Sequence, residues 1–254
     1  MKKKGFLTKK RSQYLVNYKK TLSIIQNQIL LFQILNARDY LKNKLLDVGC
    51  GERPYSLIYD ELVKESISVD TPDSPHSLGP EVIPAKADFL PFKEDTFDTV
   101  LCTEVLEHTD DFFVTLSEIQ RVLKPGGKLI CSVPFMYPLH EFPNDNLRFT
   151  YFGVLRCLAR TGLKPLTIKA KGGAGTFLVV LLFVIFSQLL VQLEKRANIR
   201  LFSCNIIRWM ISFPQYVYSR LLIFFLRHKQ TQKITDVSKY ERFLSLGYFV
   251  IAEK

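Results

Sequence analysis

Three acidic residues and two glycines in the first half of the chain have the types and spacing of a nucleotide-like binding site. Asp47 lies in an apolar run that leads into Gly49 and Gly51, and Asp70 ends a second apolar run nineteen residues after Gly51. Asp88 follows a third run of this kind. Glycines let the backbone turn tightly and approach a ligand, and a carboxylate at this spacing accepts hydrogen bonds from ribose hydroxyls. The pattern predicts a nucleotide-cofactor site.

The same residues favour a cofactor with positive charge. A dinucleotide site has a third glycine three residues beyond the second, but Pro54 occupies that position. Asp47 would also face the pyrophosphate of a dinucleotide, whereas it would attract a sulfonium or ammonium group. An NAD-dependent oxidoreductase is therefore the least favoured interpretation.

The elements that position these residues alternate along the chain. Strands are predicted at 44–48, 66–69, 82–86, 97–102, 127–133, 164–170 and 248–252, and helices at 55–64, 111–123 and 150–161. Such alternation is typical of an α/β fold with a parallel sheet and helices on both faces. Proline and glycines at 124–127 are predicted to end one helix and lead directly into the next strand.

The order of these motifs resembles the class I S-adenosylmethionine-dependent methyltransferases, in particular their small-molecule branch, known as type 11. The resemblance covers residues 44 to about 170 and the last strand. Its motifs are Leu45–Gly51, Val69–Asp70, Ala87–Phe92, Phe97–Val100, Glu104–His108 and Leu123–Leu129. It implies a Rossmann-like sheet of seven strands in which the last strand is antiparallel and lies between strands five and six.

The resemblance also implies S-adenosyl-L-methionine as the cofactor and a role for each matching residue. The methionine part would be bound by Asp47, Gly49, Cys50 and Gly51, the ribose by Asp70, the adenine by Asp88 and the Phe89 backbone, and the methionine end and substrate mouth by Thr103 and Glu104. His108 either closes the Glu-His turn that is common in this family or contacts the substrate.

The loop after the fifth predicted strand has the side chains for acceptor chemistry. It contains His140, Glu141, Asp145 and Arg148 at the sheet edge where ligands of open α/β sheets bind. An imidazole titrates near neutral pH, so His140 is predicted as the general base for a hydroxyl acceptor, with Asp145 and Arg148 as substrate contacts. The alternative is a loop held in place by an Arg148–Asp145 ion pair. The five cysteines form no Cys-x-x-Cys pair, so neither a disulfide framework nor a metal site is predicted.

Charge and hydropathy divide the chain into four parts. A basic segment with an amphipathic helix occupies 1–43, the cofactor-binding core 44–171, an apolar helical insertion 172–245 and the final strand 246–254. The net charge of +11 is concentrated at the two ends, while the core is acidic. This distribution favours an anionic membrane surface over nucleic acid as a partner.

The insertion begins with 22 uncharged residues, 172–193, which is enough to span a bilayer core. A final strand that returns to the same sheet excludes an odd number of crossings. We expect a re-entrant or in-plane helical hairpin, or at most two crossings, at the cytosolic membrane face, with no cleaved signal. The alternative is a helical cap buried on a dimer partner. The helix within 21–41 is predicted either as a lid on the sheet edge or as a membrane-surface helix.

These patterns together predict methyl transfer to an oxygen of a small or lipid-linked acceptor, such as a glycan precursor. The first alternative is carbon methylation of a quinone or other isoprenoid lipid. The second is a membrane-tethered scaffold that retains the cofactor fold without catalysis. The acceptor and the oligomeric state are left open by the sequence.

Overall fold

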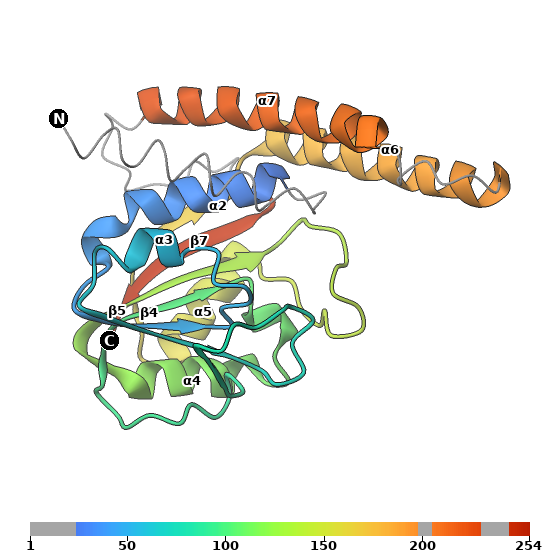
Figure 1. Ribbon diagram of the computed structural model, residues 1–254. Helices are drawn as coiled ribbons and strands as arrows, with labels where there is room; N and C mark the ends of the chain where they lie inside the picture. The colour runs from blue at the N-terminus through green and yellow to red at the C-terminus, as the bar shows by residue number, and fades with distance from the viewer. Residues whose placement is uncertain (1–23, 198–204, 230–243) are drawn as a thin grey trace.

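The computed structural model describes residues 24–197, 205–229 and 244–254, and they form a sheet with helices on both faces (Figure 1). The strands are β1 (Lys44–Val48), β2 (Glu65–Asp70), β3 (Val82–Pro84), β4 (Phe97–Thr103), β5 (Leu123–Pro134), β6 (Lys164–Ala170) and β7 (Gly247–Glu253). Their order in the sheet is β3-β2-β1-β4-β5-β7-β6. β1 to β5 pair in parallel, and β7 pairs antiparallel to β5 and β6. The predicted fold class and strand order are confirmed.

The helices are α2 (Ile24–Asn36), α3 (Ser56–Tyr59), α4 (Phe112–Val122), α5 (Tyr151–Arg160), α6 (Ala174–Ala197) and α7 (Asn205–Lys229), with short 3₁₀ turns at Arg38–Tyr40 and Leu106–His108. Side-chain caps fix two of the starts. Asp111 accepts hydrogen bonds from the first backbone N–H groups of α4, and Thr150 accepts one from Gly153 in α5. Such caps satisfy N–H groups that a helix leaves unpaired at its start.

Two predicted boundaries are wrong for local reasons. The helix expected at 55–64 ends at Tyr59, because the backbone N–H groups of Lys64 and Glu65 both donate to the Asn43 carbonyl and lead the chain into β2. Residues 124–127 lie inside β5 instead of between a helix and a strand. There the pairing with β4 shifts register, so the proline and glycines occupy an irregularity of the strand.

One face of the sheet packs on α4 and α5, and the other packs on α2. Leu30, Leu31 and Ile34 of α2 share a core with residues of β1, β4, β5 and β7, namely Leu45, Leu101, Ile130, Phe249 and Ile251. The helix therefore covers the middle of a sheet face and not its edge, which corrects the predicted lid.

The opposite side of α2 is covered as well. Ile25 and Ile29 pack against Phe177 and Phe183 of α6 and Tyr218 of α7, and Figure 1 shows α2 between the sheet and the α6–α7 pair. Nine of its thirteen residues, its three glutamines included, are buried. The prediction of a membrane-surface helix for this segment is therefore also wrong, because apolar partners on two sides leave it no free face.

The apolar insertion forms α6 and α7, two long helices outside the sheet. Their outward residues include many large apolar side chains: Leu178, Leu182, Ile185, Phe186, Leu189 and Leu193 on α6, and Phe213, Val217, Leu221, Phe224 and Phe225 on α7. Within the described residues, none of the helices combines the length and the apolar character needed to cross a bilayer.

Candidate active site

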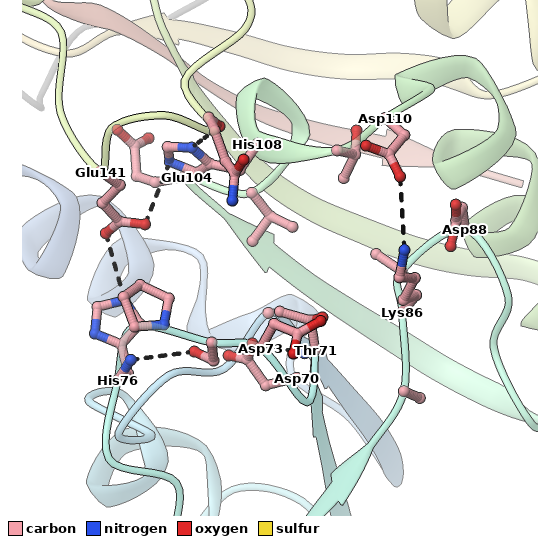
Figure 2. A pocket seen from close by; sticks show the side chains of 18 of the residues that line it. Asp70, Thr71, Asp73, His76, Lys86, Asp88, Glu104, His108, Asp110 and Glu141 are labelled. Carbon is pink, nitrogen blue, oxygen red and sulfur yellow. Dashed lines mark hydrogen bonds and ion pairs between the residues drawn. The ribbon is translucent and has the colours of Figure 1, made fainter.

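A cavity of about 470 Å³ opens at the carboxyl ends of β1, β2 and β4 (Figure 2). Its wall comes from Gly49 and from residues within four further stretches of chain, 70–76, 85–88, 104–110 and 141–144. Ligands of open α/β sheets bind outside these strand ends, so the cavity lies where the fold class expects a ligand.

The glycine turn after β1 is held in a conformation that needs glycine. Gly49 and Gly51 have positive φ angles of 65° and 51°. The backbone N–H groups of Gly49 and Cys50 both donate to the Val69 carbonyl, at 2.9 and 3.1 Å. A Cβ atom on Gly49 would lie 2.3 Å from a methyl carbon of Val105. The turn therefore brings bare backbone to the cavity wall, where a side chain would not fit.

Asp70 is oriented by the same turn. One carboxylate oxygen accepts from the Gly51 N–H at 2.6 Å and the other from the Thr71 N–H at 2.7 Å. An ionised carboxylate has about four acceptor positions, so two remain for a ligand. Because Asp70 lines the cavity, its free positions suit the two hydroxyls of a ribose.

The charged groups of the wall are mostly acidic. Its carboxylates are Asp70, Asp73, Asp88, Glu104, Asp110 and Glu141, against a single lysine and two histidines among the described lining residues. Lys86 lies 3.6 Å from Asp110 on one side of the cavity, as Figure 2 shows. Such a surplus of carboxylates attracts a cationic ligand.

Glu104 is held from outside the cavity by three side chains. Its Oε1 accepts hydrogen bonds from Ser132 and from the Lys171 ammonium, both at 2.5 Å, and its Oε2 accepts from Gln26 of α2. Lys171 has no solvent exposure. No pattern in the sequence links Gln26 or Lys171 with this site, because both approach through packing between distant parts of the chain.

Glu141 bridges two histidines across the cavity mouth. Its carboxylate lies 3.4 Å from His76 Nε2 and 3.8 Å from His108 Nε2, and Figure 2 shows it between the two rings. The hydrogen bond from His76 lowers the pKa of Glu141 below its usual value and raises that of His76. His76 was not predicted as a site residue; it lies in a proline-rich loop without any motif.

Glu107 and His140 lie behind this wall and form a tight cluster with His108, which lines the cavity. Glu107 Oε1 lies 3.7 Å from His108 Nε2 and 4.0 Å from His140 Nε2, and the Glu107 side chain is fully buried. Burial raises the pKa of Glu107 well above its ordinary value.

The predicted site residues fall into two groups. Gly49, Asp70, Asp88, Glu104 and His108 line the cavity. The others do not line it: Asp47, Cys50, Gly51, Phe89, Thr103, His140, Asp145 and Arg148.

Asp47 and Cys50 lie beneath the glycine turn, away from the cavity surface. Asp47 accepts a hydrogen bond from Tyr59 Oη at 2.9 Å, and burial raises the pKa of its carboxyl to about 7. Burial likewise raises the pKa of the Cys50 thiol. At Phe89, by contrast, the side chain is 78% exposed and points away from the core. The exposure of its side chain does not bear on the predicted adenine contact, which would be made by the Phe89 backbone.

Asp145 and Arg148 pair with each other. Two guanidinium nitrogens donate to the two oxygens of Asp145, at 2.5 and 2.6 Å, and Asp145 also accepts from the backbone N–H of His140. Burial opposes ionisation of Asp145, but these hydrogen bonds outweigh it and lower its pKa to about 2. This geometry agrees with the alternative given by the sequence, in which an Arg148–Asp145 ion pair holds the loop in place.

Comparison with known proteins places the central part of the chain in a family. The Methyltransferase domain family, type 11, matches residues 46–131. This part of the chain is a methyltransferase domain. It includes the glycine turn, Asp70, Asp88 and the cluster around Glu104, and the family predicted from the sequence is confirmed.

The relatives share the methyltransferase domain over part of their length. An uncharacterised protein of Methanocaldococcus jannaschii is 38% identical over 121 residues, which are 47% of this chain and 52% of that protein. A demethylmenaquinone methyltransferase of Bacillus cereus is 33% identical over 103 residues, 35% of this chain and 44% of the relative. The chain thus spans about half the length of these curated relatives.

Two solved structures share the fold over most of the chain. The cyclase SpnF has a TM-score of 0.53 at 16% identity, covering 89% of this chain and 81% of that one. A candidate sarcosine dimethylglycine methyltransferase of Galdieria sulphuraria has a TM-score of 0.52 at 13% identity, covering 90% and 85%. At this identity the likeness concerns the fold alone.

The cavity fits the cofactor of this domain family, S-adenosylmethionine. The bare backbone at Gly49 leaves room that a Cβ would fill, Asp70 has acceptor positions free for a ribose, and the carboxylates of the wall complement a sulfonium and an ammonium group. The domain match and this fit support S-adenosylmethionine as the cofactor, as predicted.

Proposed function

We propose that the protein transfers a methyl group from S-adenosylmethionine to a small or lipid-linked acceptor. The observation that carries this proposal is the acidic cavity inside the methyltransferase domain, with Gly49 and Asp70 oriented at the strand ends. The bound cofactor supplies an electrophilic methyl group. Residues of the cavity wall would hold the acceptor so that the methyl group passes to it while the cofactor leaves as a neutral thioether.

The protein's part is mainly binding and alignment. In-line transfer to a good leaving group depends on holding donor and acceptor together. Asp70 would hold the ribose, and Glu104, fixed by Lys171 and Ser132, would present a carboxylate at a constant place on the wall. For a hydroxyl acceptor a base must take the proton; the prediction for that role is His140, whose ring lies behind the cavity wall next to His108.

We propose an oxygen acceptor on a lipid-linked molecule such as a glycan precursor. Large apolar side chains form an outward row on α6 and another on α7, which is evidence for an acceptor with a lipid part. The same rows favour a location at the cytosolic face of an anionic membrane. The α6 residues 178, 182, 185, 189 and 193 recur at helical spacing, so they share one side of the helix. The basic ends of the chain would favour an anionic lipid surface.

Carbon methylation of a quinone is the second candidate, and one comparison favours it. The chain is about one-third identical to demethylmenaquinone methyltransferases from several bacteria over the shared domain. A quinone has an isoprenoid tail, so the apolar rows on α6 and α7 would serve this acceptor equally well. The non-catalytic scaffold differs from both because no acceptor would gain a methyl group.

Calorimetry of the demethylated cofactor tests the cofactor step. Asp70→Asn is expected to weaken binding roughly 10- to 100-fold, because hydrogen bonds to a charged group contribute about 1.5–3 kcal/mol. Asp73→Asn, another carboxylate of the same wall, is the matched control and is expected to have a much smaller effect. Equal effects of the two variants, or no binding to the wild type, would contradict the proposed ribose contact.

Methyl-labelled cofactor tests the acceptor. Membranes from cells that lack the protein are incubated with the labelled cofactor and the purified chain, and the labelled lipid or sugar is identified. Label on a glycan oxygen supports the first candidate, label on a quinone carbon supports the second, and cofactor binding without any labelled acceptor supports the scaffold. Co-flotation with vesicles containing anionic lipid, compared with a Leu182→Glu and Phe225→Glu double variant, tests the membrane surface.

A further inference from the structure

We propose that Glu107, His108 and His140 bind one divalent first-row transition-metal ion, such as Zn²⁺, beside the cavity. The three side chains come from the turn after β4 and the loop after β5. One donor atom from each lies within 4.8 Å of the other two. This site is independent of the proposed methyl transfer, because it concerns binding of an ion that the resemblance to methyltransferases does not imply.

The carboxyl group of Glu107 is buried beside two histidines without a hydrogen bond to either of its oxygens in the part of the chain that the structure describes. The side chain has no solvent exposure. Buried charged groups are otherwise paired, hydrogen-bonded or bound to metals. The groups that face Oε1 are the Nε2 atoms of His108 and His140.

Both histidines have the tautomer of a metal ligand. His108 Nδ1 lies 2.8 Å from the Asn144 carbonyl oxygen, and His140 Nδ1 lies 3.2 Å from the Asp145 carboxylate. These oxygens only accept hydrogen bonds, so each Nδ1 carries a proton, and each Nε2 offers a lone pair when the ring is in the neutral form that binds metals. Two lone pairs and a carboxylate therefore face one another. Metal-bound histidines use the same arrangement, in which the second nitrogen donates to a carbonyl or carboxylate.

The distances suit an ion better than a direct hydrogen bond. Glu107 Oε1 lies 3.7 Å from one Nε2 and 4.0 Å from the other, beyond the reach of an N–H···O hydrogen bond. Zinc–ligand bonds of about 2.0–2.2 Å in tetrahedral geometry place donor atoms about 3.4 Å apart. A closure of about 0.3–0.6 Å between Glu107 Oε1 and the two Nε2 atoms, and of at most about 1.4 Å between the two histidine donor atoms, would bring the three donors onto one ion.

The remaining coordination position would face the cavity. Glu141 Oε2 lies 3.8 Å from His108 Nε2 and both residues line the cavity, so this carboxylate or a ligand oxygen has access to the ion. Two imidazoles and a carboxylate with an open position are typical of catalytic zinc and non-haem iron sites. An acceptor hydroxyl bound there would lose its proton more readily. The Nε2 lone pair of His140 can bind the ion or accept a proton as the predicted general base, but it cannot do both. Detection of bound metal therefore distinguishes the two roles.

Cobalt titration of chelator-treated protein tests the site. Co²⁺ has visible absorption that reports its ligands, and Zn²⁺ is added as the competitor. We expect saturation at one Co²⁺ per chain, displacement by one Zn²⁺, and an affinity lower by about 100-fold or more in Glu107→Gln and in His140→Gln. Replacing even an outer-shell partner typically costs 10–100-fold in metal affinity.

His76→Gln is the matched control, because His76 lines the same cavity but is not part of the three-residue cluster. It is expected to leave the Co²⁺ affinity within about threefold of wild type. Thermal melting with and without Zn²⁺ shows that the variants fold, and the shift in melting temperature should be present in wild type and His76→Gln and absent in Glu107→Gln. Binding that is weak, exceeds one ion per chain or is equal in Glu107→Gln and wild type would mean an adventitious ion only and would overturn the proposal.

Discussion

Replacement of Gly49 by alanine tests how closely the turn after β1 is packed against the turn after β4. Any alanine at a positive φ angle costs about 1–2 kcal/mol of folding free energy. At Gly49 the new Cβ would also lie 2.3 and 2.9 Å from the two methyl carbons of Val105. Overpacking of this kind typically costs a further 1–3 kcal/mol. Gly49→Ala should therefore lower the free energy of unfolding by about 2–5 kcal/mol, measured by urea denaturation.

Gly126 provides the control for the backbone part of this cost. Its φ angle is 75°, similar to the 65° of Gly49, but nothing lies within 4 Å of a Cβ built there. Gly126→Ala should cost only the 1–2 kcal/mol of the conformation. Val105→Ala in the Gly49→Ala background removes the clash, so a double-mutant cycle should give a favourable coupling of about 1–3 kcal/mol. Equal costs for the two glycines together with zero coupling would refute the packing argument.

Three further predictions concern a buried ion pair, a buried acid and a helix cap. Glu104→Gln should destabilise the fold by about 3–5 kcal/mol, because it leaves the unexposed Lys171 ammonium without its carboxylate. Adding Lys171→Met should restore most of this loss of stability, measured by urea unfolding. No rescue would show that the unpaired charge is not the cause. Burial raises the pKa of Asp47 to about 7 from an ordinary value of 3.8, so its contribution to stability is fully present below about pH 4 and is lost as the pH rises to 7. Wild type should thus lose roughly 4 kcal/mol over this interval relative to Asp47→Asn, and parallel unfolding profiles from pH 4 to 8 would contradict the raised pKa. Asp111→Ala should cost about 1 kcal/mol in thermal or urea unfolding through loss of the α4 cap, and an unchanged stability would show that the cap is dispensable.

The sheet was predictable because its signal is local. Each central strand is a short apolar run, and the sequence placed β1 and β6 at their observed residues. The antiparallel β7 between β5 and β6 followed only from the family resemblance, since nothing in its own residues specifies a neighbour. The helix at α3 was predicted too long for a different local reason. The Asn43 carbonyl accepts hydrogen bonds from the N–H groups of Lys64 and Glu65, so the chain enters β2 at this point.

The position of α2 was not predictable from its own residues. Its apolar residues indicated a helix with one buried side, yet buried glutamines such as Gln28 and Gln33 show that it is covered on two sides. The second cover comes from α6 and α7, about 150 residues further along the chain. Sequence spacing within one helix carries no information about such a partner.

Site residues were predictable where their spacing in the sequence identifies them. They were not predictable where they meet only through packing between distant parts of the chain. The distance between Gly51 and Asp70 identified the carboxylate that the structure places in the cavity wall. The contacts of His76 with Glu141 and of Lys171 with Glu104 join residues more than sixty positions apart. Their roles arise only when the loops at the strand ends come together.

The hydrogen bonds from Gln26 and Lys171 to Glu104 connect the outer helices with the cofactor cavity. Gln26 belongs to the helix on which α6 and α7 rest, and Lys171 lies three residues before α6. A displacement of the α6–α7 pair therefore moves both anchors of a carboxylate on the cavity wall. If a partner of those outer helices shifted them and so changed the affinity for the methyl donor, thermodynamic reciprocity would require the donor to change the affinity for that partner by the same factor.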